Sequence, residues 1–486
     1  MRVRNLLTHS QKKSATSVSL CIWEQIFANQ AEGYRREVLS RHVAKHRRRS
    51  DETLLRAVLT GYIRATSKSQ LTRVDVHMKN GMQKPEMVGR QSARRGSRAS
   101  ALVGALAVFS TAAFAAGPNA DQATRMYNRI AGVPPTASQL SQMMAAADPV
   151  TAALIATKDP SFYNNTIRNM AMPWTNRDQT VFAPLNDYVA TVIGMVRDDV
   201  AFNTLLTADI LYIAGSGAPG IPAYSPANND MYEALDTDGT DLSKVSNLMQ
   251  TTQSSLTGIP STAVAGVLTT RAAANAFFMD GTNRRMFRFT MINHLCNDLQ
   301  TVMDITRPPD RIRQDVTRSP GGVSTLFLTN CIGCHSGMDP MAQAFAYYQY
   351  QYDVTTDPTG AAGKIVYTLG QVQPKYHINN TNFPQGFSTP DDSWSNRWRA
   401  GPNEVLGWSG SLPGSGNGAN SLGKELESSA AFTSCQVTRV FKEVCLRAPN
   451  TGADNTQITS MIASFQSHQY KLRQPFAEAA AYCMGN

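Results

Sequence analysis

Apolar residues between residues 120 and 214 recur every three or four positions, which is the spacing of amphipathic helices. This pattern predicts helices at 123–130, 136–147, 149–157, 186–196 and 202–213. It returns at 271–299, with a break near Gly281, and at 428–447, 456–466 and 470–483. We therefore expect a mainly α protein.

Residues 354–425 interrupt the helical pattern. They are rich in Gly, Pro, Asn and Ser and lack a clear period, which predicts a long irregular loop insertion with short strands at 365–368 and 407–408. We expect a helical N-terminal domain over 116–260. A second helical region over 261–486 then holds the insertion and a C-terminal three-helix segment.

An uncharged stretch, ALVGALAVFSTAAFA at 101–115, follows a head that is rich in arginine. A basic head, an apolar run of this length and small residues at the exit are typical of a secretory signal peptide, which we assign to 87–115 with cleavage after Ala115. The run is too short to span a bilayer comfortably as a permanent anchor. The mature chain is thus expected to be periplasmic or otherwise exported, with no permanent transmembrane anchor.

The basic charge of the chain is concentrated before this signal. Residues 1–100 hold 21 Lys and Arg against 7 Asp and Glu, a net charge of +14, whereas the remainder has a net charge of −4. Residues 1–86 are either a basic leader or a spurious extension upstream of a start at Met82 or Met87. The positive charge is therefore no argument for nucleic-acid binding by the mature chain.

The strongest chemical signal is Cys331-Ile332-Gly333-Cys334-His335, a C-x-x-C-H motif typical of covalent c-type haem attachment. One turn of chain places two thiols near the two vinyl groups of one porphyrin. His335 then supplies an imidazole as an axial ligand of the haem iron. We expect one covalently bound haem c per chain, on Cys331, Cys334 and His335.

Two other interpretations of the motif have less support. A zinc ribbon needs a second close Cys/His pair, and the other histidines of the mature chain, His294, His377 and His468, form none. A thioredoxin-like pair is expected in a β-α-β context, which the helical pattern lacks.

The remaining cysteines of the exported chain suggest two disulfides. Cys435 and Cys445 lie on one predicted helix, roughly 15 Å apart along its axis, which is too far for a disulfide. If the last three helices run up, down and up, Cys445 and Cys483 end at the same level. We therefore predict Cys445–Cys483, which leaves Cys296–Cys435 as the second bridge.

Several passages resemble exported bacterial proteins with planctomycete-type cytochrome c domains. The most specific is the C-x-x-C-H motif followed by Met338-Asp339-Pro340, and the others are RIAGVPP at 129–135, VAFNTLLTAD at 200–209, GVLT at 266–269 and SCQVTRVF at 434–441. The resemblance implies haem on Cys331, Cys334 and His335 and an extracytoplasmic redox role. It implies no particular substrate.

The second axial ligand of the iron is not determined by the sequence. Met338 is a poor candidate because it lies only three residues from His335, on the same side of the ring. Met461, His377, His468 and the Met279–Met291 stripe are rivals, and a five-coordinate iron with an open face is a further possibility.

The loop before the motif carries Arg307, Arg311, Arg313 and Arg318. Its arginines are either solvated or pair with the haem propionates, which need charge-assisted donors.

We expect a mono-haem c-type cytochrome protein that transfers single electrons to a redox partner protein of unknown identity. The sequence reveals no catalytic constellation besides the motif. The alternative is a haem-dependent oxidoreductase or peroxidase-like enzyme with an open iron face. A third hypothesis is a structural or surface-binding protein that haem stabilises.

Overall fold

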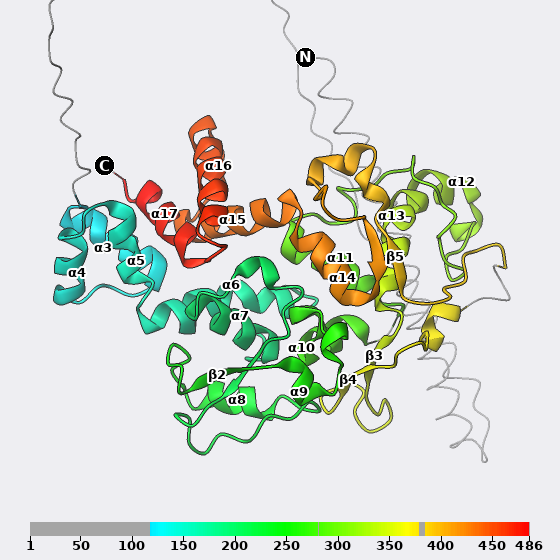
Figure 1. The fold of residues 1–486 in the computed structure, drawn as a ribbon, viewed down its shortest axis with the longest axis horizontal. Coiled ribbons are helices and arrows are strands. Elements are labelled where there is room, and N and C mark those ends of the chain that lie inside the picture. Colours follow the sequence, from blue (N-terminus) through cyan, green and yellow to red (C-terminus); the bar gives the residue numbers. More distant parts are fainter. Residues whose placement is uncertain (1–116, 280, 379–383, 486) are drawn as a thin grey trace, which may run out of the picture. The chain divides into compact units, whose positions relative to one another are not determined.

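The computed structural model describes residues 117–279, 281–378 and 384–485, and the structural statements below concern these residues. This part of the chain is mainly helical, as the sequence predicts, with three two-stranded antiparallel sheets (Figure 1). The leader 1–86, the signal peptide 87–115 and its cleavage site lie outside the described residues.

The α-helices are α3 (Ala120–Ala131), α4 (Ala137–Met144), α5 (Pro149–Ala156), α6 (Arg168–Ala171), α7 (Asp187–Arg197), α8 (Asp230–Thr237), α9 (Gln253–Thr257), α10 (Arg271–Phe278), α11 (Arg284–Leu295), α12 (Ser324–Leu326), α13 (Ile332–Ala342), α14 (Gly418–Glu427), α15 (Ala430–Cys445), α16 (Gly452–Ser467) and α17 (Arg473–Cys483). The sheets pair β1 (Leu211–Ala214) with β2 (Leu248–Thr251), β3 (Tyr348–Gln351) with β4 (Lys364–Tyr367), and β5 (Ser393–Ser395) with β6 (Ser415–Asn417). Two π-helical segments, Phe162–Ile167 and Phe327–Cys331, and several 3₁₀ helices join them.

Local side chains explain where many helices begin. The hydroxyl of Thr136 accepts a hydrogen bond from the backbone of Gln139, and the side chains of Asn186 and Ser429 cap α7 and α15 in the same way. Each cap satisfies a backbone N–H that the first turn of a helix leaves without a partner.

Two predicted elements are wrong. Residues 202–213 form a short 3₁₀ helix, Phe202–Thr204, and the strand β1 instead of one helix, because β1 pairs with β2 from elsewhere in the chain. The predicted strand at 407–408 is absent from the described structure, since Gly407 adopts a φ of 67° that ends the 3₁₀ helix Pro402–Leu406. Strand β4 does form within one residue of its predicted position at 365–368.

Both predicted disulfides are confirmed. Cys296 and Cys435 are bonded with their α-carbons 5.3 Å apart, and Cys445 and Cys483 with theirs 5.5 Å apart. The first bridge ties the end of α11 to α15, and the second ties the end of α15 to the end of α17.

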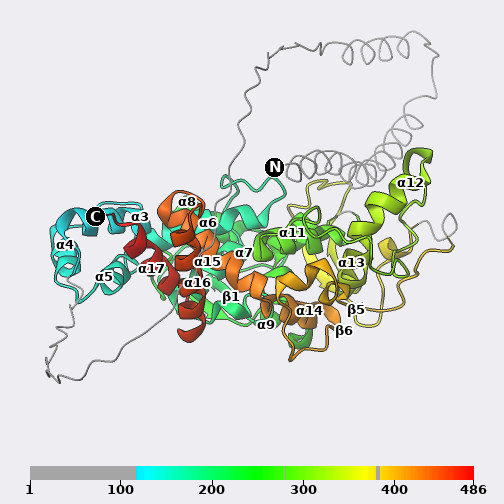
Figure 2. The same ribbon diagram turned by 90° about the horizontal axis from the view of Figure 1, so that it is seen from above.

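One large cluster of buried apolar side chains extends from Ala123 in α3 to Ala480 in α17. Helix α17 packs against α5 and α3 as well as α15 and α16, so both ends of the described chain share this core (Figures 1 and 2). The domain boundary at residue 260 stays a prediction. Among the described helices, none combines the length and apolar character that a bilayer crossing requires.

Candidate functional site

The motif lies on α13, a helix whose side chains are all buried. The chain enters it through the π-helical turn Phe327–Cys331. Such turns are rare and often occur at functional sites. Cys331, His335 and Asp339 are spaced four residues apart and therefore share one face of the helical segment.

Two glycines form a second face of α13 and let other elements approach closely. A Cβ at Gly337 would overlap the indole of Trp398, which is fully buried. A Cβ at Gly333 would lie 3.3 Å from the Cβ of Met303. This close packing presses α13 against the chain on the side away from His335 and fixes the position of the helix.

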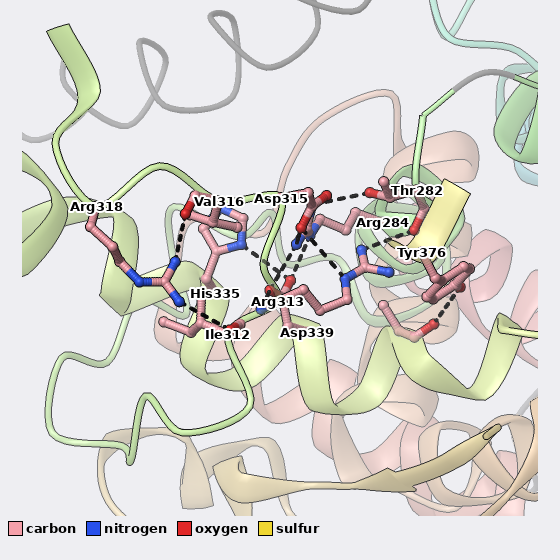
Figure 3. Close-up of polar contacts among 11 residues, drawn as sticks. Thr282, Arg284, Ile312, Arg313, Asp315, Val316, Arg318, His335, Asp339 and Tyr376 are labelled. Carbon is pink, nitrogen blue, oxygen red and sulfur yellow. Dashed lines mark hydrogen bonds and ion pairs between the residues drawn. The ribbon is translucent and has the colours of Figure 1, made fainter. Parts of the chain in front are cut away.

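On the motif face, the imidazole of His335 contacts a carboxylate. Nδ1 of His335 lies 3.1 Å from Oδ1 of Asp339, and the side chain of His335 is 5 % exposed (Figure 3). An ionised carboxylate can only accept hydrogen bonds, so Nδ1 of His335 donates the hydrogen in this contact. No described residue forms a hydrogen bond with Nε2 of His335.

Asp339 is itself held by an arginine from α11. Nε and Nη2 of Arg284 donate to its two oxygens over 2.6 and 2.8 Å, and the backbone N–H of Arg313 adds a third bond of 3.1 Å. Burial raises the pKa of Asp339, but the charge of Arg284 and the hydrogen bonds from Arg284 and His335 outweigh it and hold the pKa well below its usual range. The carboxylate is therefore ionised although it is fully buried.

Arg284 also binds Asp315, through bonds of 2.6 Å from Nη1 and 2.8 Å from Nη2. Burial raises the pKa of Asp315, and the charges of Arg284 and Arg313 lower it by more, so this carboxylate is also ionised. One guanidinium thus bridges two buried carboxylates from different segments. We call Arg284, Asp315 and Asp339 the carboxylate bridge.

The cysteines of the motif lie in different surroundings. Cys331 belongs to a small apolar cluster with Ile312, Val316, Phe327 and Ile332, separate from the main core. The thiol of Cys334 lies 3.5 Å from the carbonyl oxygen of Leu299, and burial followed by the charge of Asp298 raises its pKa to about 12. The Cys334 thiol is a free, protonated group in this structure.

The solvated interpretation of the arginine loop is wrong for Arg313. Its side chain is 1 % exposed, lies 4.5 Å above the ring of Tyr376 and donates to the carbonyl of Thr282 over 3.0 Å. Its Nε and Nη1 are buried and form no hydrogen bond with a described residue, although Nε lies 3.9 Å from a carboxylate oxygen of Asp315. Nη1 of Arg311 is also buried without a hydrogen bond.

The other two arginines of the loop, Arg307 and Arg318, bond to residues close to them in the sequence. Arg307 pairs with Asp304 at 3.0 Å, and Arg318 donates to the carbonyl oxygens of Val316 and Ile312. Arg311 and Arg313 are therefore the arginines of this loop with buried donor atoms left for an anionic group.

Some candidates for the second iron ligand lie on elements that contact α13, and the others lie on an element apart from it. The turn Pro374–His377 reaches α13, because Tyr376 donates to the carbonyl of Ala342 over 3.1 Å, and α11, which carries much of the Met279–Met291 stripe, packs against α13. Met461 and His468 belong to α16 and its C-terminal cap, and Figures 1 and 2 show α16 apart from α13.

The described residues fit a c-type haem in three respects. Nε2 of His335 has no hydrogen-bond partner among the described residues, the cluster beside Cys331 is apolar, and Arg313 holds buried nitrogen atoms that form no hydrogen bond with a described residue. Metal-bound histidines characteristically donate their other N–H to a carboxylate or carbonyl, as His335 does to Asp339.

Sequence reasoning missed the carboxylate bridge. Asp339 had a signal, since it lies four residues after His335 in a helical segment, where side chains meet. Arg284 and Asp315 had none, because they come from α11 and from a loop and meet Asp339 only in the folded chain.

The chain is matched by no protein-family model, no curated protein and no solved structure.

Proposed function

We propose that this protein is an exported c-type cytochrome protein with one haem, which transfers single electrons between partners outside the cytoplasm. The observation that carries the proposal is the arrangement of His335, whose Nδ1 is held by Asp339 while Nε2 has no hydrogen-bond partner among the described residues. A buried imidazole with Nδ1 held by a carboxylate and Nε2 without a hydrogen bond is suited to bind iron through Nε2.

In this proposal, Cys331 and Cys334 would hold the porphyrin through one thioether bond each. His335 would supply a nitrogen ligand to the iron, and Arg311 and Arg313 would offer donors for the propionates. The haem, when bound, supplies a one-electron couple, and the chain excludes water from its iron ligand.

The region 261–486 is, in this proposal, a helical cytochrome c region with a long insertion that carries β4, β5 and β6. Export through the signal peptide 87–115 agrees with the two disulfides, which persist in oxidising compartments. The resemblance to exported proteins with planctomycete-type cytochrome c domains supports the same assignment.

Intact mass spectrometry and a pyridine haemochrome spectrum of the exported protein test the proposal together. We expect a chain that begins at Ala116 and carries one covalent haem with the spectrum of two thioether bonds. A Cys331→Ala/Cys334→Ala variant is the control and should carry none. A wild-type chain exported without haem would refute the proposal.

One observation favours a second candidate, a haem-dependent oxidoreductase or peroxidase-like enzyme. The carboxylate of Asp339 makes His335 a more basic ligand, and a strongly donating proximal ligand favours bond-breaking chemistry at an iron with an open face. Carbon monoxide added to the reduced protein separates the two. Rapid binding supports an open iron face, whereas a sealed six-coordinate electron carrier leaves the spectrum unchanged.

A further inference from the structure

We propose that Asp339 is the positioning residue of the iron ligand His335, and that the carboxylate bridge lowers the reduction potential of the haem. This inference rests on the proposed function, because it assigns a role to residues around the same site. It concerns Arg284, Asp315 and Asp339, which lie outside the C-x-x-C-H motif.

The positioning follows from geometry. His335 and Asp339 are one turn apart on α13, and the 3.1 Å contact from Nδ1 fixes both the tautomer and the direction of the ring (Figure 3). Asp339 cannot swing away from His335, because its two oxygens accept three further hydrogen bonds, two from Arg284 and one from the backbone of Arg313. Nε2 is therefore held in a single direction.

The effect on potential follows from charge. Asp339 is fully buried, so its negative charge acts on the imidazole with little screening by water. A negative charge beside the ligand stabilises the oxidised iron, which carries one more positive charge than the reduced iron. The bonded carboxylate also makes the imidazole more basic, which acts in the same direction.

Asp315 sets the strength of this effect. Its two bonds to Arg284 share the guanidinium between two carboxylates, so Asp339 is less completely neutralised than in a simple pair. The cationic groups drawn around the site are Arg284, Arg313 and Arg318, and the anionic ones are Asp315 and Asp339 (Figure 3). Loss of either carboxylate charge makes the net charge of these groups more positive, which favours the reduced iron.

The test is the reduction potential of the haem-loaded protein, measured by spectroscopic titration in the wild type and four variants. For Asp339→Asn we expect the reduction equilibrium to shift at least tenfold toward reduced iron, about 59 mV for one electron. Asp315→Asn should shift it in the same direction by less. Asp339→Glu keeps the charge and should recover at least half of the shift.

Asp454→Asn is the matched control. Asp454 is also a buried aspartate with two bonds to one arginine, Arg447, but it lies on α16, apart from α13. Its loss should lower stability and leave the potential unchanged. A purely structural carboxylate bridge predicts the same for Asp339→Asn, so an unchanged potential in a haem-loaded Asp339→Asn protein overturns the inference. If that variant does not fold, an unchanged potential in Asp315→Asn does so.

A separate measurement distinguishes failure of this inference from failure of the proposed function. In the haem-free Cys331→Ala/Cys334→Ala protein, ¹⁵N NMR of labelled histidine should show His335 protonated at Nδ1 only, and Asp339→Ala should abolish this preference. A wild-type chain without haem refutes the proposed function. A mixed tautomer of His335 in the presence of Asp339 refutes the positioning.

Discussion

The two nitrogens of His335 have different roles because their neighbours differ. Nδ1 is engaged by the carboxylate of Asp339, and Nε2 is left without a hydrogen bond among the described residues. Free imidazole would populate both tautomers, but a fully buried carboxylate that only accepts hydrogen bonds selects one. The tautomer of His335 thus depends on Asp339, a residue that lies outside the C-x-x-C-H motif.

Gly337 shows how a single residue fixes α13 from the opposite side. Gly337→Ala should destabilise the fold by about 1–3 kcal/mol, because the added methyl group overlaps the indole of the buried Trp398. Urea unfolding measures the change. Gly452→Ala, at the start of α16, is the control, since a Cβ there meets nothing within 4 Å and should be neutral or slightly stabilising. Equal stabilities of the two variants would contradict this packing.

At the scale of elements, what could be predicted is what depends on neighbouring residues. Helix caps act within one turn, so Thr136 and Asn186 mark the starts of α4 and α7 in the sequence. The disulfide Cys445–Cys483 followed from helix lengths and assumed helix directions, and Cys296–Cys435 was the pair that remained. The placement of Cys331, Cys334 and His335 on one helical segment follows in the same way from their spacing.

Elements that depend on distant partners could not be predicted. Strand β1 replaces a predicted helix because its backbone bonds to β2, and this pairing overrides the local apolar spacing. Arg284 likewise becomes part of the site only when α11 packs against α13. Burial of Arg313 depends on the ring of Tyr376, which the irregular insertion supplies.

Helix α14 ends in a buried carboxylate that should make stability depend on pH. Glu427 accepts hydrogen bonds from the backbone of Leu206 and the hydroxyl of Thr207 and lies 3.5 Å from Lys424, and burial raises its pKa to about 7. The folded protein therefore binds this proton more tightly than the unfolded chain. The resulting stabilisation is complete below the unfolded pKa of about 4.5 and is lost as the pH rises through about 7.

Glu427→Gln removes this titration. We expect the wild type to lose on the order of 3 kcal/mol more than the variant between pH 4.5 and pH 8. Urea unfolding across this range measures how the free energy of unfolding of each protein depends on pH. Because the two proteins share all other titratable groups, the difference between them reports Glu427 alone. Parallel curves for the two proteins would show that Glu427 titrates alike in the folded and unfolded states.

At the scale of the whole described chain, one core joins its two ends. Phe162, which precedes α6, packs edge-on against Phe476 of α17 with ring centroids 5.0 Å apart, and Arg129 of α3 donates to the carbonyl of Val444 in α15. Asp199 and Arg473 form a further ion pair between the two ends. The helices before residue 260 and those after it therefore support each other.

A shared core predicts that the N-terminal helices and α13 unfold together. Phe476→Ala should cost about 3–5 kcal/mol, because Phe476 is fully buried against Phe162. Pulsed hydrogen exchange with mass spectrometry at increasing urea follows peptides from α5 and α13 separately. We expect both to lose protection at one lowered midpoint. Phe182→Ala, at a side chain that is 92 % exposed, should leave the midpoint unchanged. If α5 lost protection early while α13 kept its wild-type midpoint, the predicted boundary at residue 260 would separate two independently stable domains.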